Sequence, residues 1–236
     1  MDFLEYKLTT DLPSHLPVNL QVACTINPHS YCVAKEDGLF REALLSADIL
    51  IPDGIGVVWA SKYLYKKRIE KISGFDLHLH FLKMLQKKGG GKVFYLGASE
   101  RTLGLIMTRL KKEFPQIQAA VYSPPFKSEF TKEENLEMIR EINQFEPDVL
   151  FVGMTAPKQE KWVFLNKKNL KAKMVCSIGA VFDFYAGTVQ RPNEVWINLG
   201  LEWLPRFLNE PRRLWRRNLI STPRFIFDVF QMKLRI

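Results

Sequence analysis

Six short apolar segments, separated by segments of helical periodicity, make up most of residues 19–200, and this alternation constrains the fold more than any other feature of the sequence. The apolar segments are NLQVACTIN, DILIPD, KVFYLGA, QIQAAVYS, PDVLFVG and KMVCSIGA, and the helical patterns cover residues 36–46, 54–65, 99–113, 131–145 and 157–169. Strands that alternate with helices form βαβ units with a parallel sheet. We therefore predict an α/β fold, with a Rossmann-like, mostly parallel sheet flanked by helices.

The predicted sheet also indicates where a ligand binds. In open parallel sheets the ligand lies beyond the carboxyl ends of the strands. The polar and glycine residues that directly follow the strands are therefore the candidate site residues. They fall in five segments, at residues 25–29, 52–56, 97–99, 153–160 and 179–183.

The positive charge of the chain is concentrated near its C-terminus. The net charge is +9, from 34 Lys and Arg against 25 Asp and Glu, and such a surplus attracts phosphate-bearing partners. Residues 201–236 hold eight basic and three acidic side chains, a balance of +5. The strand pattern also stops near residue 200, and 236 residues suit one large domain with an appendage. We predict an α/β body over residues 1–200 and a basic, helical appendage over residues 201–236.

Two short helices are predicted in the appendage, near residues 211–220 and 223–235, because Pro211 and Pro223 each suit a first helical turn. Such segments either lie on an anionic membrane surface or pack their apolar face on the body. Arginine beside aromatic residues also suits single-stranded nucleic acid, although the rest of the chain shows no nucleic-acid-binding module. The first helix carries an arginine stripe and the second an apolar face, formed by Arg212, Arg213, Arg216 and Arg217 and by Phe225, Ile226, Val229 and Phe230.

Several classes of protein are disfavoured. Three widely spaced cysteines, Cys24, Cys32 and Cys176, provide neither a disulfide framework nor a Cys-x-x-Cys metal pair, and they indicate a reducing cytoplasm. We expect no signal peptide and no transmembrane helix, since no apolar run approaches ~18–20 residues. His78 and His80 point to different faces of a helix. Neither an Asp-x-Asp pair nor a dinucleotide fingerprint is present, so we predict no metal site and no cofactor.

Asp53 is the strongest candidate for chemistry, because it directly follows a predicted strand and precedes Gly54 and Gly56. A carboxylate in this place is able to take a proton from an attacking sugar hydroxyl, while the glycines let a ligand approach the backbone. The same Asp-Gly pair is also an ordinary turn signal. Thr25 and Asn27 end the preceding strand, where they are placed to bind sugar hydroxyls or a uracil ring.

Further candidates follow two later strands. Gly97 precedes a helix whose N-terminal N–H groups suit phosphate, although such a turn is also a common structural feature. Lys158, Gln159 and Glu160 begin another helix, where lysine suits phosphate and glutamine suits a base or a sugar; they also fit an ordinary helix start. Without a metal, the charge on a departing diphosphate must be met by arginine, lysine or backbone N–H groups. The appendage has arginine in surplus.

Together these motifs resemble those of the WecG/TagA/CpsF family, glycosyltransferase family 26. The matching segments run in the family's order from about residue 20 to residue 225. They are Thr25-Ile-Asn27, Ala47-Asp48, Pro52-Asp53-Gly54-Ile55-Gly56-Val57-Val58, Ser73-Gly74-Phe75-Asp76, Val93-Phe94-Tyr95-Leu96-Gly97, Pro147-Asp148-Val149-Leu150-Phe151-Val152-Gly153, Pro157-Lys158-Gln159-Glu160, Gly179-Ala180-Val181-Phe182-Asp183-Phe184, Ala186-Gly187, Gly200-Leu201-Glu202-Trp203-Leu204, Arg206 and Glu210-Pro211-Arg212-Arg213.

The resemblance implies an inverting, metal-independent glycosyltransferase that uses no cofactor. It implies transfer of a sugar, of the N-acetylmannosamine type or a hexose, from a UDP-sugar to an undecaprenyl-diphosphate-linked saccharide in cell-surface polysaccharide or teichoic acid synthesis. Asp53 resembles the family's general base and Thr25 its neighbouring active-site threonine. Gln159 lies in its substrate-binding Pro-Lys-Gln-Glu motif, and Asp183 joins the substrate-binding candidates through the Gly-Ala-Val-Phe-Asp-Phe motif.

The resemblance also implies two roles for the appendage. In the family it binds the membrane and adds arginine to the active site, for which Arg206, Arg212 and Arg213 are the best matches. We therefore expect a cytoplasmic protein, peripheral on the inner face of the plasma membrane. Its expected partners are a UDP-sugar, a lipid-linked saccharide and an anionic membrane surface, but not nucleic acid. The alternatives are a Rossmann-type oxidoreductase and a basic nucleic-acid-binding protein.

Overall fold

The structure is a computed structural model that describes residues 1–190, 192–193, 195–196 and 200–234. Its centre is a six-stranded sheet in the order β4-β3-β8-β7-β5-β6, in which every neighbouring pair is parallel. All six strands lie where the apolar segments predicted them, so the α/β fold with a parallel sheet is confirmed. The strands are β3 (Gln21–Ile26), β4 (Ile49–Pro52), β5 (Gly91–Gly97), β6 (Ile117–Tyr122), β7 (Val149–Gly153) and β8 (Met174–Ser177).

Burial on both faces explains why the central strands are apolar along their whole length. Every residue of the central strand β8 is buried, and so is every residue of β4 at one edge of the sheet. A parallel sheet that is covered by helices on both faces requires such strands. The register sets Thr25 beside Ile51 and Ile26 beside Pro52, so the segments that follow β3 and β4 leave the sheet at the same edge.

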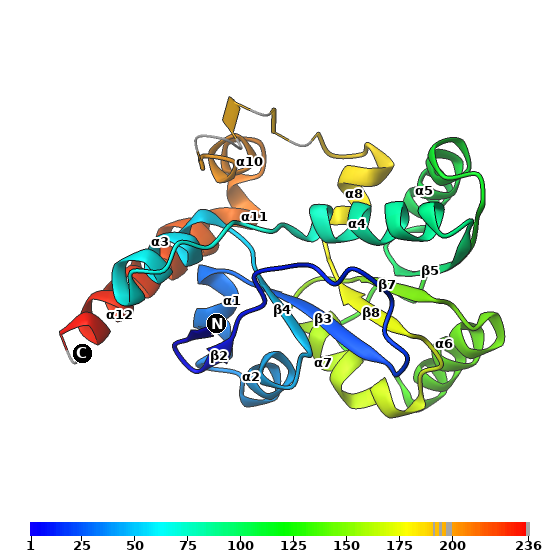
Figure 1. Cartoon of the computed structure of the whole chain (residues 1–236), viewed down its shortest axis with the longest axis horizontal. Coiled ribbons are helices and arrows are strands. Elements are labelled where there is room, and N and C mark those ends of the chain that lie inside the picture. Colours follow the sequence, from blue (N-terminus) through cyan, green and yellow to red (C-terminus); the bar gives the residue numbers. More distant parts are fainter. Residues whose placement is uncertain (191, 194, 197–199, 235–236) are drawn as a thin grey trace.

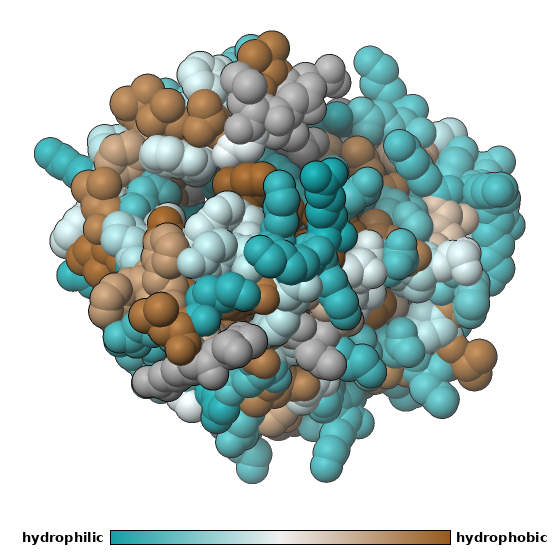
Figure 2. Space-filling view, turned by 60° about the vertical axis from the view of Figure 1, so that its left-hand side comes forward, coloured by the Kyte–Doolittle hydropathy of each residue, from teal (hydrophilic) through white to brown (hydrophobic). Residues whose placement is uncertain are grey.

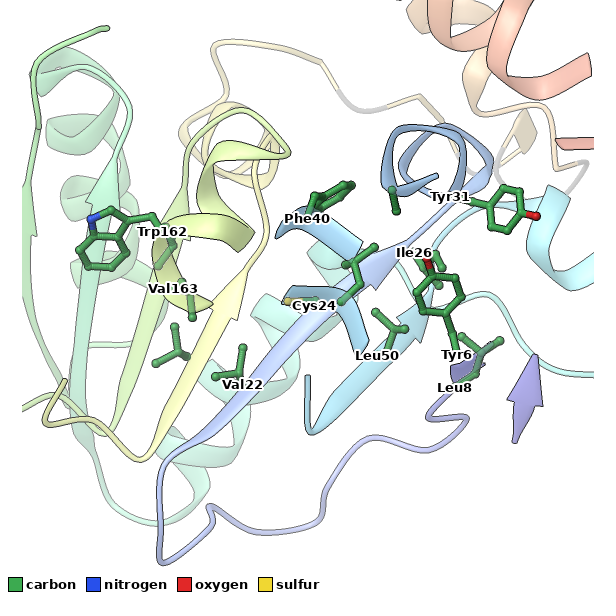
Figure 3. Close-up of a cluster of buried hydrophobic side chains, with 14 of the residues drawn as sticks. Tyr6, Leu8, Val22, Cys24, Ile26, Tyr31, Phe40, Leu50, Trp162 and Val163 are labelled. Carbon is green, nitrogen blue, oxygen red and sulfur yellow. The ribbon is translucent and has the colours of Figure 1, made fainter. Parts of the chain in front are cut away.

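The helices cover the sheet in two layers (Figure 1). One layer holds α1 (Pro28–Ala34), α2 (Gly38–Leu45), α6 (Lys132–Phe145) and α7 (Lys158–Asn166); the other holds α4 (Gly74–Lys87), α5 (Glu100–Glu113) and α8 (Val181–Ala186). Each layer encloses its own cluster of buried apolar side chains. Figure 3 shows part of the first cluster, which includes Val22, Cys24, Ile26, Phe40, Leu50, Trp162 and Val163.

Side-chain caps explain where several of these helices begin. In each case a side-chain oxygen accepts a hydrogen bond from a backbone N–H of the first turn, which has no partner within the helix. At Asn27 this becomes a capping box, in which the Ser30 hydroxyl also accepts from the Asn27 N–H. That box fixes the start of α1 directly after β3. The capping residues are Asn27, Asp37, Ser73, Ser99 and Thr131.

A small N-terminal hairpin was not predicted from the sequence. It consists of β1 (Asp2–Phe3) and β2 (Tyr6–Lys7), which pair antiparallel. Phe3, Tyr6 and Leu8 are buried, and Figure 3 shows Tyr6 and Leu8 in the first core cluster. Strands of two residues are too short to show a period, so this hairpin gives no sequence signal.

The C-terminal segment is helical, as predicted, but its helices are joined differently. It contains α10 (Trp203–Asn209), α11 (Pro211–Trp215), a π-helical turn η2 (Arg216–Ser221) and α12 (Thr222–Lys233). The predicted break before Pro223 is wrong, because the backbone stays helical through η2. Pro223 has no N–H, and its ring would collide with the Leu219 carbonyl in a regular α-helix. The wider turn removes that collision, and the Thr222 N–H and hydroxyl both donate to the Arg217 carbonyl.

The last helix, α12, packs on α1 and α3 (Ile55–Tyr65) of the body (Figure 1). Phe225 and Val229 are fully buried and belong to the core cluster of β3. The Phe225 ring meets the Tyr31 ring edge-on at 5.3 Å. Ile226 and Phe230, which were expected on the same face, are 37% and 45% exposed. The appendage therefore shares its core with the body and also leaves apolar side chains at the surface.

Two phenylalanines of α12 offer a matched test of this packing. We expect Phe225→Ala to lower the free energy of unfolding by about 3–5 kcal/mol, because it leaves a cavity in a closed core. Phe227→Ala removes a ring that is 60% exposed, and we expect a change within about 0.5 kcal/mol. Urea unfolding of both variants measures the difference. Equal effects would contradict the packing of α12 on the body.

Candidate active site

At the carboxyl edge of the sheet, the chain leaves the neighbouring strands β3 and β8 toward opposite faces. The chain leaves β3 into α1 in one helical layer, and it leaves β8 into α8 in the other (Figure 1). In open α/β sheets this topological switch point is where ligands bind. Thr25 and Asn27 lie on the β3 side, and the segment from Gly179 to Asp183 lies on the β8 side. Most of the predicted site residues are at this edge.

Asp53 lies beside the end of β3, because its N–H donates to the Ile26 carbonyl at 2.8 Å. Its side chain is partly exposed, yet it sits deep among protein atoms. Burial raises the pKa of the Asp53 carboxyl above its usual value. The charge of Glu202 acts in the same direction, while the charges of Arg217, Lys71 and Arg206 oppose it, with Arg217 the strongest. The pKa of the Asp53 carboxyl is therefore raised by burial, and several cations partly oppose that rise.

The charged groups around Asp53 come mainly from the C-terminal segment. Arg217 lies in η2 and Arg206 on α10, where its guanidinium is 4.9 Å from the centre of the Phe184 ring. Lys71 and Glu202 form an ion pair at 2.5 Å, and each side chain is 18% exposed. This pair joins the segment before α4 to the start of α10. The appendage thus contributes to the electrostatics of Asp53 as well as packing on the body.

Of the two candidate residues at the end of β3, Asn27 caps a helix and Thr25 is partly exposed at the site. The side-chain oxygen Oδ1 of Asn27 accepts from the N–H groups of His29 and Ser30, so it is occupied as the cap of α1. Thr25 is partly exposed at the same edge as Asp53. Gly54 has φ of +103°, a conformation that favours glycine, and a Cβ there would lie 3.9 Å from the Asn27 side chain. At Gly56 a Cβ would lie 2.6 Å from Pro28, so this glycine serves the packing of α3 on α1.

Gln159 and Glu160 are buried and bond to each other at the start of α7. The Gln159 side-chain oxygen accepts from the Met154 N–H at 3.1 Å, and its amide nitrogen donates to Glu160 at 2.8 Å. The other oxygen of Glu160 has no hydrogen-bond partner among the described residues. A Cβ at Gly179 would lie 3.4 Å from the Gln159 oxygen. Gln159 and Glu160 therefore hold the loop that follows β7. A direct contact of these side chains with substrate stays a prediction.

Other candidates lie farther along this edge. Lys158 donates to the Lys127 carbonyl and lies 3.6 Å from the centre of the Phe130 ring. Asp183 accepts a hydrogen bond from Thr188 at 3.2 Å. Gly97 has φ of +121°, and a Cβ there would lie 2.3 Å from the Gly153 carbonyl oxygen. Glycine at 97 is therefore required by the close approach of β5 and β7, and a phosphate role for it stays a prediction.

The three predicted arginines of the appendage separate in the structure. Arg206 is among the largest contributors to the pKa of Asp53, whereas Arg212 is exposed on α11 and is not among them. The side chain of Arg213 lies outside the described part of the chain. Arg217 and Lys71 were not predicted as site residues. Arg217 belongs to the arginine stripe, but its direction depends on the π-helical turn that Pro223 demands.

The histidine pair in α4 is structural. His78 is buried, its Nε2 lies 2.8 Å from the Tyr95 hydroxyl, and burial lowers its pKa to about 3. His80 bonds to the Pro13 carbonyl at 2.8 Å. Among the described residues, no three His, Cys, Asp or Glu side chains are grouped to hold a metal ion. None of the described helices is long and apolar enough to cross a membrane.

The buried Glu160 carboxyl leads to an expected pH dependence of stability. Burial raises its pKa from 4.5 to about 7. The folded state therefore holds the proton more tightly than the unfolded chain, so stability is complete below about pH 4.5 and falls as the pH rises through 7. Glu160→Gln removes this loss. We expect the unfolding free energies of variant and parent to diverge by roughly 2–3 kcal/mol between pH 5 and pH 8, in favour of the variant. Parallel curves in urea titrations would contradict a buried, protonated Glu160.

Known proteins match the chain over both the body and the appendage. The model of the glycosyl transferase WecG/TagA/CpsF family matches residues 9–236. An N-acetylglucosaminyldiphosphoundecaprenol N-acetyl-beta-D-mannosaminyltransferase of Bacillus spizizenii is 32% identical over 98% of this chain and 89% of that protein. Proteins of the same name from Bacillus subtilis and Staphylococcus aureus are 30% and 29% identical, over 89% and 90% of this chain and 79% and 80% of their own lengths.

Proposed function

The chain belongs to the WecG/TagA/CpsF family of glycosyl transferases, and from this premise we propose that it moves a sugar from a UDP-sugar to a polyprenyl-diphosphate-linked saccharide during synthesis of a cell-surface polymer. The names of the relatives support an acceptor that carries N-acetylglucosamine and a donor of the N-acetylmannosamine type. A hexose donor is the second candidate. The oxidoreductase and nucleic-acid-binding alternatives are set aside, because the family match covers body and appendage alike.

The observation that carries the proposal is a basic carboxylate, Asp53, at the carboxyl edge of the sheet with cations around it. We assign to Asp53 the removal of the proton from the acceptor hydroxyl. That oxygen attacks the anomeric carbon on the side opposite UDP, so one bond forms as the bond to UDP breaks. A single displacement of this kind inverts the anomeric configuration. A raised pKa suits the task, because a general base is most effective when its pKa approaches the working pH.

Arg206 and Arg217 are assigned to the charge that develops on the departing diphosphate. The charges of both cations lower the pKa of the Asp53 carboxyl, which supports this assignment. Fixed guanidinium groups bind phosphate oxygens strongly, and they stabilise a developing anion without reorganisation. A metal ion is then not required. Activity should survive excess EDTA, and a loss that Mg²⁺ or Mn²⁺ restores would contradict this assignment.

The surface of the C-terminal helices supports docking on an anionic membrane. Leu219, Phe227 and Leu234 are 62%, 60% and 89% exposed, and basic side chains lie between them. Figure 2 looks toward the end of the molecule that holds α3 and α12, and it shows apolar side chains among hydrophilic ones. Such a surface inserts apolar groups at the acyl boundary while its cations meet lipid headgroups. The enzyme is thus proposed to act as a peripheral protein at the inner face of the plasma membrane, where a lipid-linked acceptor is accessible.

Vesicle binding tests the docking surface. We expect the double variant Leu219→Ser/Phe227→Ser to bind vesicles of phosphatidylglycerol and phosphatidylcholine at least about tenfold more weakly, since each buried apolar side chain contributes roughly 1.5–3 kcal/mol. Leu136→Ser is the matched control, because Leu136 is 57% exposed on α6, outside the C-terminal segment. Sedimentation with vesicles measures both. Equal binding by parent and double variant would place the membrane contact elsewhere.

A donor and acceptor screen tests the proposed reaction. Purified protein is incubated with a panel of UDP-sugars and a short-chain polyprenyl diphosphate that carries N-acetylglucosamine, and released UDP is measured. We expect release that requires both substrates, with UDP-N-acetylmannosamine the preferred donor. Release that is independent of the acceptor, or absent with every UDP-sugar, would overturn the proposal.

A further inference from the structure

His29 and Ser221 connect the first helix of the body to the π-helical turn of the appendage. The His29 Nδ1 and the Ser221 hydroxyl are 2.9 Å apart and share a hydrogen bond. A second contact reinforces the first, because the Cys32 thiol donates to the Ser221 carbonyl at 3.3 Å. Ser221 and Cys32 are buried. The hydroxyl and the carbonyl of Ser221 are therefore both held by α1, 192 and 189 residues earlier in the chain.

Ser221 is the last residue of the same turn that contains Arg217. The turn is irregular, and the Arg217 carbonyl accepts from both the N–H and the hydroxyl of Thr222. A shift of Ser221 therefore moves the backbone that carries Arg217. The Arg217 charge lowers the pKa of Asp53 and also that of His29, so its electrostatic effect reaches both side chains. The turn η2 thus carries both Arg217, whose charge acts on Asp53, and Ser221, which contacts α1.

We propose that His29 is a positioning residue: its hydrogen bond to Ser221 holds the π-helical turn so that Arg217 faces Asp53. The location of His29 suits this task, because it follows the Asn27 cap and Pro28, at the end of β3 and next to the site. Pro28 is in turn pressed against Gly56 of α3, so the start of α1 is fixed on both sides.

The surroundings of His29 favour its neutral ring. Burial lowers its pKa, and the nearby Arg217 lowers it further. A neutral ring keeps the hydrogen bond to Ser221 without repelling the guanidinium. The charged groups that act on Asp53 are Arg217, Glu202, Lys71 and Arg206, and of these only Arg217 lies in the turn that His29 holds, among the described residues.

The pKa of the Asp53 carboxyl tests the proposal directly. The full-length protein is labelled with [¹³C]aspartate, the carboxyl resonances are followed with pH, and Asp53→Asn identifies the signal. Arg217→Gln should raise the Asp53 pKa, since it removes the strongest favourable charge. His29→Leu and Ser221→Ala should each reproduce most of that rise, and the two together should add little to either one. His29→Asn, which keeps a polar atom near the position of Nδ1, should restore much of the parent value.

A matched control separates positioning from general loosening of the appendage. Asp228→Asn breaks the Lys35–Asp228 pair, which also joins α1 to the appendage but does not act on Asp53. It should leave the Asp53 pKa unchanged. The proposal is overturned if Arg217→Gln does not raise the pKa, or if His29→Leu and Ser221→Ala leave it at the parent value. A rise in Asp228→Asn as large as in Ser221→Ala would also overturn it.

The catalytic consequence of this arrangement rests on the proposed function, but the titration does not. If the glycosyl transfer takes place, the acid limb of the kcat profile should move to higher pH in Ser221→Ala, because Asp53 must lose its proton to act as a base. If no UDP-sugar is turned over by the parent, the function fails while the carboxyl titration still decides whether His29 positions Arg217.

Discussion

Asp53→Asn should lower kcat by about 10²–10⁴-fold and leave the protein folded. Asparagine has nearly the same shape, but it does not accept the proton of the acceptor hydroxyl. The backbone of Asp53 donates to the Ile26 carbonyl, and this bond does not depend on the side chain. We therefore expect an unchanged melting temperature and a KM for the donor within a few-fold of the parent value.

Acceptor-dependent UDP release measures this effect. Asp228→Asn is the control, because it removes a carboxylate from an ion pair on α12, away from the site. It should retain near-parental turnover. Normal turnover by Asp53→Asn would remove Asp53 from the chemistry, and a loss that comes with unfolding would show that its role is structural.

The second large effect is expected from the two cations of the appendage. Arg206→Gln and Arg217→Gln should each lower kcat by roughly 10²–10³-fold, as is typical when a group that stabilises a developing anion is lost. Arg217→Gln carries a further signature. Because Arg217 lowers the pKa of Asp53, its loss raises that pKa, and the acid limb of the kcat profile moves to higher pH.

Arg224→Gln provides the control for charge. Arg224 lies on α12 and pairs with Glu36 at the surface, so this variant removes an appendage arginine that does not act on Asp53. It should keep nearly full activity on a water-soluble acceptor. If Arg224→Gln and Arg217→Gln lose activity equally on that acceptor, the appendage acts through its overall charge instead of through placed side chains.

These substitutions test the appendage better than its removal does. Deletion of residues 201–236 does not separate an anchor from a catalytic element, because Phe225 and Val229 are fully buried in the core of the body. Deletion would open that core, and the loss of activity would not reveal which role the appendage has.

The sheet was predictable because its signal is local and strong. Each strand is a short apolar run with turn or helix residues on both sides, and burial on both faces demands such runs. The same pattern placed Thr25 and Asp53 at one edge, since parallel strands end together there. The register of β3 with β4 confirms this placement.

The roles of several glycines and polar residues were not predictable in this way. Gly56 and Gly97 looked like openings for a ligand, but each is required by the close approach of other backbone or side-chain atoms. Gln159 looked free to read a substrate, yet its amide is bonded to Met154 and Glu160. Such roles depend on which distant residues meet after folding, and one sequence does not specify these contacts.

The importance of Arg217 depends on a backbone irregularity. A regular helix through residues 211–233 would place the arginine stripe by its period of 3.6 residues. A wider, π-helical turn instead precedes Pro223, and it changes the direction of the residues within it. From the sequence, Pro223 predicted the start of a new helix. Arg217, the cation that lowers the pKa of Asp53 most, was therefore not predictable as a site residue from the sequence.

The anomeric configuration of the product tests the central claim most directly, which is that Asp53 acts as the base of a single displacement. An α-linked UDP-sugar that the enzyme accepts is converted with the N-acetylglucosamine-bearing acceptor, and the new linkage is assigned by ¹H and ¹³C NMR. A β linkage is the expected result, because one displacement inverts the anomeric carbon. An α linkage would mean that the configuration is retained, which a single back-side displacement does not give, and it would contradict the role assigned to Asp53.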